Sequence, residues 1–202
     1  MRKVILAMQM TLDGFSTGPN GEMDWLPPFN DEKSWKDLHE EMWNQLRSVD
    51  TFLLGRVTYQ IWEKHWPAAA TSPSSTRNDI EFSRFAEKTQ KIVFSKTLER
   101  AEWKNTRLVK ENIAEEIARM KQQPGKNMVV AGGAGIAQTF MRLDLIDEYY
   151  VTVHPVVLGM GKPLFGNLGD RIKLKLVGTK TFNTGAVELH YQPKTESGAR
   201  ER

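Results

Sequence analysis

Residues 127–138 read Asn127-Met128-Val129-Val130-Ala131-Gly132-Gly133-Ala134-Gly135-Ile136-Ala137-Gln138, and they carry the most information about the fold. A short apolar run ends in a cluster of glycines and then opens into a segment with helical character. Glycine lets the backbone approach a ligand closely, and a helix that follows presents unpaired amides and a positive dipole end to an anion. The pattern predicts a strand, a phosphate-binding turn and a helix, although packing alone can also require glycine at such a turn.

The position of this turn argues against an ordinary Rossmann domain. In that fold the glycine turn follows the first strand, and an acidic residue comes about 20 residues later. Here the turn lies two-thirds of the way along a chain of 202 residues. We therefore expect another α/β nucleotide-binding layout.

The remaining apolar patterns predict the order of the elements. Helices and strands alternate first, with strands expected at residues 3–10, 51–54, 91–95 and 107–109. The helices are expected at residues 34–48 with Ser34 as N-cap, from Thr58 to Trp62, around residues 80–85, and after Asn112 as N-cap. Residues 67–75 have the composition of a surface loop. Strands at residues 147–157, 172–177 and 186–192 then follow one another, so we expect a mainly parallel sheet flanked by helices, with an antiparallel C-terminal edge.

The bulk composition is that of a single globular domain, expected at residues 1–193 with a polar tail at 194–202. The net charge of +3 is too small to predict nucleic-acid binding. Without cysteine the chain has no disulfide or thiolate metal site, which fits a cytoplasmic protein. The four histidines are far apart in the sequence, so we expect no metal site. The apolar run at residues 4–8 is too short for a signal peptide, and no segment reaches membrane-spanning length, so we expect no membrane partner.

Three expected strand ends carry residues suited to a nucleotide. In an open α/β sheet, ligands bind at the carboxyl ends of the strands. Two of these turns offer cations and hydroxyls, and the third offers bare backbone amides, which together match the pyrophosphate and the extra phosphate of NADPH. Arg56 and Lys96 can also be read as solvated charges, and Thr58 as a helix N-cap. The candidate cofactor residues at the turns are Gly55, Arg56, Thr58, Ser95, Lys96, Gly132, Gly133, Ala134 and Gly135.

Five motifs in a fixed order then suggest a family. They are Met10-Thr11-Leu12-Asp13-Gly14-Phe15, Leu54-Gly55-Arg56-Val57-Thr58-Tyr59, Ile92-Val93-Phe94-Ser95, Val130-Ala131-Gly132-Gly133-Ala134 and His154-Pro155-Val156-Val157-Leu158-Gly159-Met160-Gly161-Lys162-Pro163-Leu164-Phe165. In these motifs the chain resembles the dihydrofolate-reductase-like superfamily, in the branch of the C-terminal reductase domain of the bacterial riboflavin-biosynthesis deaminase/reductase. The resemblance covers about residues 3–192.

The resemblance implies a dihydrofolate-reductase-like fold, NADPH as cofactor, and a homodimer with the C-terminal strands as interface. It places the adenosine and 2′-phosphate of the cofactor near the two cationic turns and the pyrophosphate at the glycine turn. Ala7 and Gln9 would line the nicotinamide and substrate pocket, over which residues 13–25 would close. The substrate side would be bordered by residues 159–165. Candidate substrate residues are Trp25, Gly161, Lys162 and Phe165.

The acidic candidates have competing interpretations. Asp13 is either a turn residue, as is usual for Asp-Gly, or a catalytic group beside the nicotinamide. Asp31, Glu32 and Asp37 follow a Trp-Leu-Pro-Pro segment and are candidates for the acid of a folate reductase. Their position near a helix start is also favourable for electrostatic reasons alone. We interpret His154 as a core residue.

The function expected from these features is an NADPH-dependent reductase acting on a small heterocycle or a ribosylamino-pyrimidine. The best-precedented reaction is that of a 5-amino-6-(5-phosphoribosylamino)uracil reductase in riboflavin biosynthesis, for which Lys162 and Arg171 are candidate phosphate-binding cations. Deamination is excluded, because the zinc deaminase domain needs cysteine ligands. A dihydrofolate or pterin reductase and a non-catalytic NADPH-binding protein are the alternatives.

Overall fold

The computed structural model of the chain describes residues 1–26 and 32–194, with side chains from residue 35 onward in the first helix. The proposed tail beyond Lys194 therefore lies outside the described residues. The same holds for Asp31 and for the side chain of Glu32, two of the candidate folate acids.

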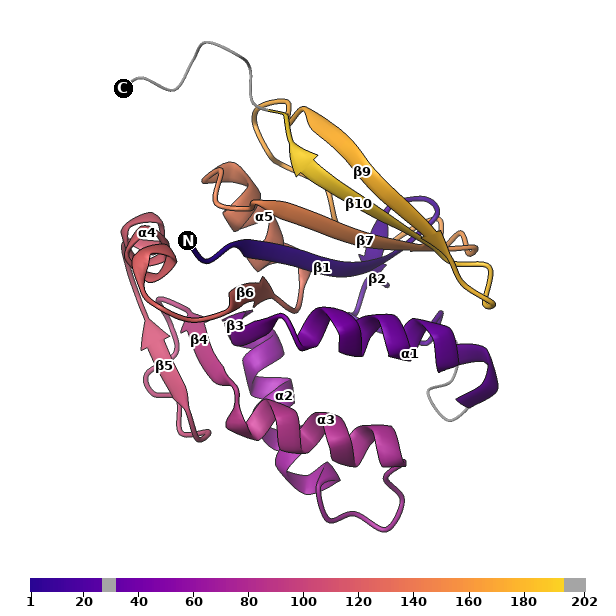
Figure 1. Ribbon diagram of the computed structural model, residues 1–202, viewed down its shortest axis with the longest axis horizontal. Coiled ribbons are helices and arrows are strands. Elements are labelled where there is room, and N and C mark those ends of the chain that lie inside the picture. The colour runs from indigo at the N-terminus through magenta and orange to yellow at the C-terminus, as the bar shows by residue number, and fades with distance from the viewer. Residues whose placement is uncertain (27–31, 195–202) are drawn as a thin grey trace.

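An eight-stranded sheet forms the centre of the described structure (Figure 1). Its order is β5-β4-β3-β6-β1-β7-β10-β9, parallel from β5 to β7 and antiparallel at β10 and β9. The strands are β1 (Val4–Thr11), β3 (Val49–Gly55), β4 (Gln90–Phe94), β5 (Thr106–Val109), β6 (Asn127–Val130), β7 (Glu148–His154), β9 (Leu174–Thr181) and β10 (Val187–Pro193). The predicted parallel sheet with an antiparallel C-terminal edge is confirmed.

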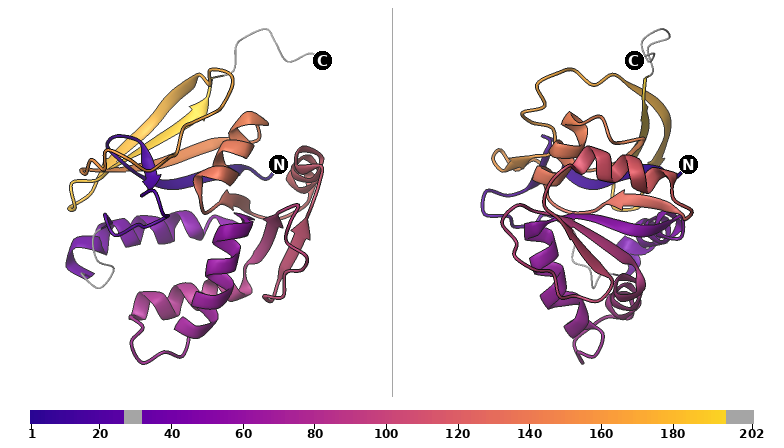
Figure 2. Two further views of the ribbon diagram at one scale, coloured as in Figure 1. Left: turned by 180° about the vertical axis from the view of Figure 1, so that it is seen from behind. Right: turned by 90° about the vertical axis from the view of Figure 1, so that its left-hand side faces the viewer.

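Helices cover both faces of this sheet (Figures 1 and 2). One face carries α1 (Glu32–Leu46), α2 (Arg56–Ala69) and α3 (Arg77–Lys88), and the other carries α4 (Ile113–Gln122) and α5 (Ala134–Arg142). Alternation along β1 divides the core accordingly. Val4 and Leu6 pack with α4 and α5, whereas Ile5 packs with the first three helices.

A small second sheet joins two loops that the sequence analysis treats separately. β2 (Phe15–Thr17) pairs antiparallel with β8 (Lys162–Pro163). Gly161 makes this approach possible, because a Cβ there would lie 2.3 Å from the backbone oxygen of Thr17. The residues after β1 and the residues after β7 therefore form one unit.

Two expected helix boundaries are wrong. The first helix begins at Glu32, so Ser34 lies inside it and is not its N-cap. The expected loop at 67–75 begins later, because α2 continues through Pro67 to Ala69. A proline so near the helix end removes only one late hydrogen bond. The last turn of α2 is held against α3, where the rings of Trp66 and Phe82 lie 4.4 Å apart.

Three further local predictions need correction. Asn112 precedes α4, but it adopts a left-handed conformation with φ of 54° and makes no side-chain cap. The strand expected at 147–157 ends at His154, since Pro155 has no amide to continue the ladder. The strand expected at 172–177 runs instead over β9, which keeps pairing with β10 across a bulge.

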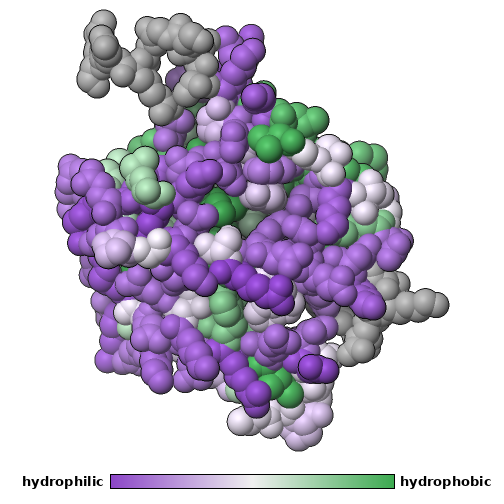
Figure 3. All heavy atoms as spheres, in the orientation of Figure 1, coloured by the Kyte–Doolittle hydropathy of each residue, from purple (hydrophilic) through white to green (hydrophobic). Residues whose placement is uncertain are grey.

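The described residues add three observations. On the face in Figure 3, hydrophilic residues predominate and apolar residues gather in small separate patches. None of the described helices is both long and apolar enough to cross a membrane. Among the described residues, no three His, Cys, Asp or Glu side chains gather in a group that could hold a metal ion.

Candidate functional site

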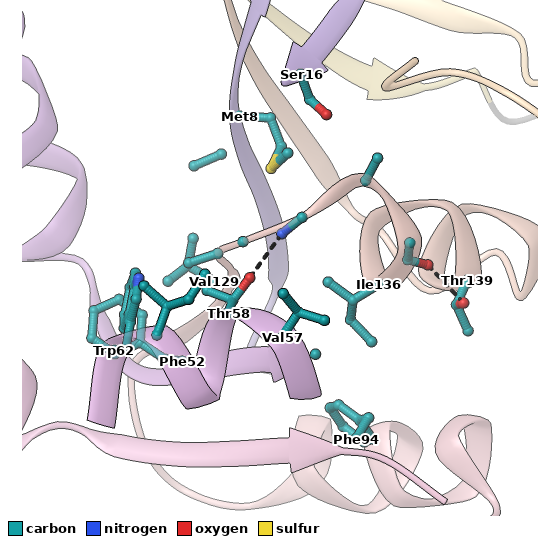
Figure 4. Close-up of a pocket in the computed structure, with 18 of the residues that line it drawn as sticks. Met8, Ser16, Phe52, Val57, Thr58, Trp62, Phe94, Val129, Ile136 and Thr139 are labelled. Carbon is teal, nitrogen blue, oxygen red and sulfur yellow. Dashed lines mark hydrogen bonds between the residues drawn. The ribbon is translucent and has the colours of Figure 1, made fainter. Parts of the chain in front are cut away.

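A cavity of about 1430 Å³ follows the carboxyl ends of the central parallel strands and continues between the helices of one face. We call the part lined by residues 55–58, 95–96, 110–115 and 131–136 the turn side. The part lined by α1, Trp62, Phe82 and residues of β7 and β10 is the helix side. Figure 4 shows Thr58 between them, with Phe52 and Trp62 on one side and Phe94, Ile136 and Thr139 on the other.

The glycine turn is fixed to the start of α2. The hydroxyl of Thr58 accepts a hydrogen bond of 3.0 Å from the amide of Gly133 (Figure 4). Gly132 has φ of +134°, and a Cβ there would lie 2.5 Å from the same hydroxyl. Glycine is therefore required at 132 by conformation and by packing.

Two helices begin at the turn side without side-chain caps. Gly55 precedes α2 and Gly133 precedes α5, and neither helix has an acidic residue in its first turn. A Cβ at Gly135 would meet no atom within 4 Å, so the start of α5 borders open space. Exposed first-turn amides and two positive dipole ends favour an anion here.

Charged side chains surround this anion-favouring region. Arg56 and Lys96 line the cavity as placed by the sequence, and both are exposed. Arg56 donates to the side chain of Gln60 at 3.0 Å. Lys110 also lines the turn side. It comes directly after β5, much as Lys96 comes after β4, but sequence reasoning missed it.

The hydroxyl at position 95 has a local role in the structure. Ser95 Oγ accepts hydrogen bonds from the amides of Thr97 at 3.2 Å and Leu98 at 3.0 Å. It therefore shapes the turn after β4 and still borders the cavity. Two exposed carboxylates, Glu111 and Glu115, line the same side and partly offset its positive charge.

The helix side is mainly apolar and aromatic. Ala7 and Gln9 of β1 also line the cavity. The apolar and aromatic side chains that line the helix side are Trp35, Leu38, Met42, Leu46, Phe52, Ile61, Trp62 and Phe82. Such walls suit a flat, largely apolar ring.

One buried carboxyl borders the helix side. Glu188 of β10 is 8% exposed, and its Oε2 accepts a hydrogen bond of 2.8 Å from Nε2 of Gln45 on α1. Burial raises the pKa of Glu188 above its ordinary value. Sequence reasoning missed both residues. The signal that could have found Glu188 was a glutamate between apolar residues in the strand expected at 186–192.

Asp13 does not line the cavity. Its carboxylate accepts hydrogen bonds from the hydroxyl of Thr11 at 2.6 Å and from the amides of Leu158 at 3.1 Å and Gly159 at 2.7 Å. The Thr11 hydrogen bond and the two amides lower the pKa of Asp13. In this position Asp13 ties the turn after β1 to the loop after β7.

The four candidate substrate residues do not come together. Lys162 lines the cavity, whereas Trp25, Gly161 and Phe165 are not part of its lining. Trp25 packs edge-on against the ring of His154, at a centroid distance of 5.4 Å. Gly161 allows the close approach of β2 and β8. Phe165 lies outside the lining, and its side chain is 43% exposed.

Two other candidates are placed clearly by their contacts. His154 is 2% exposed, and its Nε2 lies 2.5 Å from Oε1 of Gln9. Burial lowers its pKa to about 4, so it is a neutral core histidine, as expected. Asp37 accepts a hydrogen bond from the amide of Asn183 at 2.7 Å and is not part of the cavity lining, so the structure does not support this candidate for a folate acid. Arg171 is exposed and is not part of the lining either.

Comparison with known proteins identifies the family. A model described as the RibD C-terminal domain matches residues 2–187. The chain belongs to this family. Its members are NADPH-dependent reductases with a dihydrofolate-reductase-like fold. Over 190 residues the chain is 36% identical to YyaP of Bacillus subtilis strain 168, a protein described as uncharacterized, with 94% of each chain covered.

Solved structures show the same fold at lower identity. A putative riboflavin biosynthesis protein from Shewanella sp. PV-4 matches with a TM-score of 0.68 and 23% identity, over 96% of this chain and 99% of that one. The Thermotoga maritima deaminase and 5-amino-6-(5-phosphoribosylamino)uracil reductase matches with a TM-score of 0.64 and 18% identity, over 96% of this chain and 57% of that one. Dihydrofolate reductase from Enterococcus faecalis, solved with NADP(H), matches with a TM-score of 0.54 and 15% identity, over 96% and 97% of the two chains.

Proposed function

We propose that the chain is an NADPH-dependent reductase of a small heterocyclic substrate. The observation that carries this proposal is one continuous cavity that joins two uncapped helix starts to an aromatic chamber. An anionic cofactor suits the first part and a flat ring suits the second. Membership of a family of NADPH-dependent reductases supports the same assignment.

The residues of the turn side fit the phosphates of such a cofactor. The pyrophosphate would lie at the starts of α2 and α5, where Gly133 and Gly135 leave space that a side chain would occupy. The 2′-phosphate would pair with Lys96 and Arg56, with Lys110 as a third cation in reach of the same region. Ala7 and Gln9 would form the floor beneath the nicotinamide.

When bound, the cofactor would supply a hydride, and the protein would supply position and shelter. Hydride transfer requires the donor carbon and the acceptor carbon to be held at near-attack distance. Side chains would hold them there by packing against the cofactor and the substrate. The aromatic walls of the helix side, among them Trp35 and Trp62, would orient the substrate ring and exclude water. Several residues between 16 and 23 also line the cavity, and this segment would cover the ring.

For the substrate we propose a ribosylamino-pyrimidine, the type of compound in the name of the Thermotoga maritima enzyme. A ribose phosphate needs a cation near the substrate. Of the two candidates from the sequence, Lys162 lines the cavity and Arg171 does not. Lys162 would therefore be the phosphate-binding residue.

A dihydrofolate or pterin reductase is a second candidate, and one observation favours it. The helix side combines aromatic walls with the buried carboxyl of Glu188, which suits a neutral ring with polar edges. Activity with dihydrofolate and inhibition by antifolates would distinguish this candidate from the first.

The experiment that tests the proposed function is parallel titration with NADPH and NADH, followed by ligand fluorescence and thermal stabilisation. We expect wild type to bind NADPH more tightly than NADH, and Lys96→Ala to lose that preference. Lys64→Ala removes an exposed lysine outside this cavity and serves as the matched control. No binding of either cofactor would overturn the proposal. NADPH binding without oxidation in the presence of any pyrimidine or pterin would favour a non-catalytic binding protein.

A further inference from the structure

A polar row crosses four strands on the helix side. Gln9 of β1 is in register with Thr152 of β7, Thr152 with Glu188 of β10, and Glu188 with Lys180 of β9. Other polar side chains share this face, with Tyr150 two residues before Thr152 on β7 and His190 two residues after Glu188 on β10. Within the row, Lys180 is exposed whereas Glu188 is buried. Burying a carboxyl is costly unless it is paired, so the contacts of Glu188 decide what it can do.

Helix α1 contacts this row at two points. Nε2 of Gln45 donates to Glu188 at 2.8 Å, and Oε2 of Glu41 pairs with Lys180 at 2.5 Å. Glu41 and Gln45 are one turn apart on α1, so the same face of the helix makes both contacts. Of these four residues, Gln45 and Glu188 line the cavity.

The surroundings of Glu188 favour its neutral form. Burial has the largest effect and raises its pKa, and the carboxylate of Glu41 on α1 acts in the same direction. The hydrogen bond from Gln45 and the ammonium of Lys180 on β9 oppose that rise. Tyr150 of β7 also faces this carboxyl, and its own pKa is raised to about 12 by burial and nearby carboxylates, so it adds no charge. A carboxyl with a raised pKa keeps its proton to a higher pH than an ordinary glutamate and can donate it to a bound substrate.

We propose that Glu188 is the proton donor of this reductase and that Gln45 positions it, an inference that rests on the proposed function. The substrate class is a heterocycle or ribosylamine with a C=N bond, whose nitrogen faces Glu188. When bound, NADPH would supply a hydride to the carbon of the C=N bond and leave as NADP⁺, and the π electrons of that bond would pass to the nitrogen. The O–H bond of Glu188 breaks, the N–H bond forms, and the carboxylate regains its proton from solvent.

The other titratable groups along the described cavity are less suited to this role. Glu111 and Glu115 are exposed and lie on the turn side, near Lys110. His39 borders the helix side, but its ring stacks on Trp35 and its Nδ1 lies 3.0 Å from the side-chain nitrogen Nδ2 of Asn78. Glu188 alone combines burial with a place in the lining of the helix side.

The test compares wild type with Glu188→Gln, Gln45→Met and the control Glu99→Gln, which changes an exposed residue outside the cavity. The first readout is independent of turnover: carbon NMR of labelled glutamate carboxyls across pH. We expect one carboxyl to titrate above the ordinary range in wild type and in the control. That signal should be absent in Glu188→Gln and shifted further upward in Gln45→Met, which lacks the donor that stabilises the charged form.

The second readout is NADPH binding and oxidation, with 5-amino-6-(5-phosphoribosylamino)uracil and dihydrofolate as probes. We expect Glu188→Gln to bind NADPH like wild type but to turn over about 100-fold more slowly, as for loss of a general acid. Wild-type turnover should fall as pH rises through the pKa of Glu188, and the variant should lose that limb.

The outcomes separate this inference from the proposed function. Absence of NADPH binding in wild type would overturn both. Normal NADPH binding with unchanged turnover in Glu188→Gln, or a Glu188 carboxyl that titrates in the ordinary range, would overturn the inference alone. NADPH binding without reduction of either probe would also overturn it, because it names these acceptors as the substrate class.

Discussion

The hydroxyl of Thr58 accepts the amide of Gly133 at 3.0 Å, and this bond joins the first turn of α2 to the start of α5. The two residues are 75 positions apart in the sequence. Their contact sets the spacing between two helix starts that are both free of side-chain caps. The bond therefore fixes the two helix starts relative to each other, as the proposed phosphate site requires before its ligand binds.

Gly132 and Gly135 belong to the same turn but should respond oppositely to alanine. Gly132→Ala forces a side chain into a positive φ and against the Thr58 hydroxyl, so we expect a loss of about 1–3 kcal/mol in unfolding free energy. Gly135→Ala adds a methyl group to open space in the first turn of a helix and should stabilise the fold by about 0.5–1 kcal/mol. Urea unfolding measures both.

Cofactor titration of the same two variants separates packing from binding. If the pyrophosphate lies at the start of α5, the methyl group of Gly135→Ala occupies its space, and NADPH affinity should fall although stability does not. Gly135→Ala with unchanged NADPH affinity would contradict the proposed position of the pyrophosphate.

Asp13→Asn tests whether Asp13 acts on the loop after β7. An amide side chain accepts hydrogen bonds more weakly than a carboxylate, so the amides of Leu158 and Gly159 should exchange with solvent faster. Hydrogen exchange followed by mass spectrometry measures this for the peptide that spans both residues. Unchanged protection there, together with lost turnover, would instead favour the catalytic interpretation of Asp13.

The sequence predicted the turn side well because its signals are local. Glycines and cations directly after apolar runs mark strand ends, and a parallel sheet brings such ends to one edge. Gly55, Lys96 and Gly133 therefore line one cavity, as their positions suggested. Lys110 follows the same rule, since it comes directly after the strand expected at 107–109, and sequence reasoning missed it although that signal was present.

The helix side could not be assembled from local patterns. Gln45 and Glu188 meet only because α1 packs across β10, which closes a sequence separation of 143 residues. Asp37 was a candidate only because it follows the Trp-Leu-Pro-Pro segment, and its contact with Asn183 takes it to the β9–β10 turn. The β2–β8 pairing likewise depends on Gly161 and the backbone of a remote loop. Such contacts are decided by tertiary packing.

We propose that β9 is the interface of the expected homodimer. It is the last strand of the described sheet, and Leu176 and Val177 on it are 50% and 48% exposed. An unpaired strand edge with exposed apolar residues invites pairing with another chain. We expect light scattering to give a dimer mass for wild type and a monomer mass for Val177→Asp. A wild-type monomer at high concentration would contradict the proposal.

His154 should make the fold sensitive to mild acid. Burial lowers its pKa from 6.5 to about 4 in the folded chain, so between these pH values the unfolded chain binds a proton that the folded chain does not. Stability should therefore fall as pH drops through this window, by about 3 kcal/mol for this group. His154→Gln should flatten the decline when unfolding free energy is measured from pH 7 to pH 4. His65→Gln, which changes an exposed histidine, should keep the wild-type slope, and equal slopes in all three proteins would mean that His154 titrates normally.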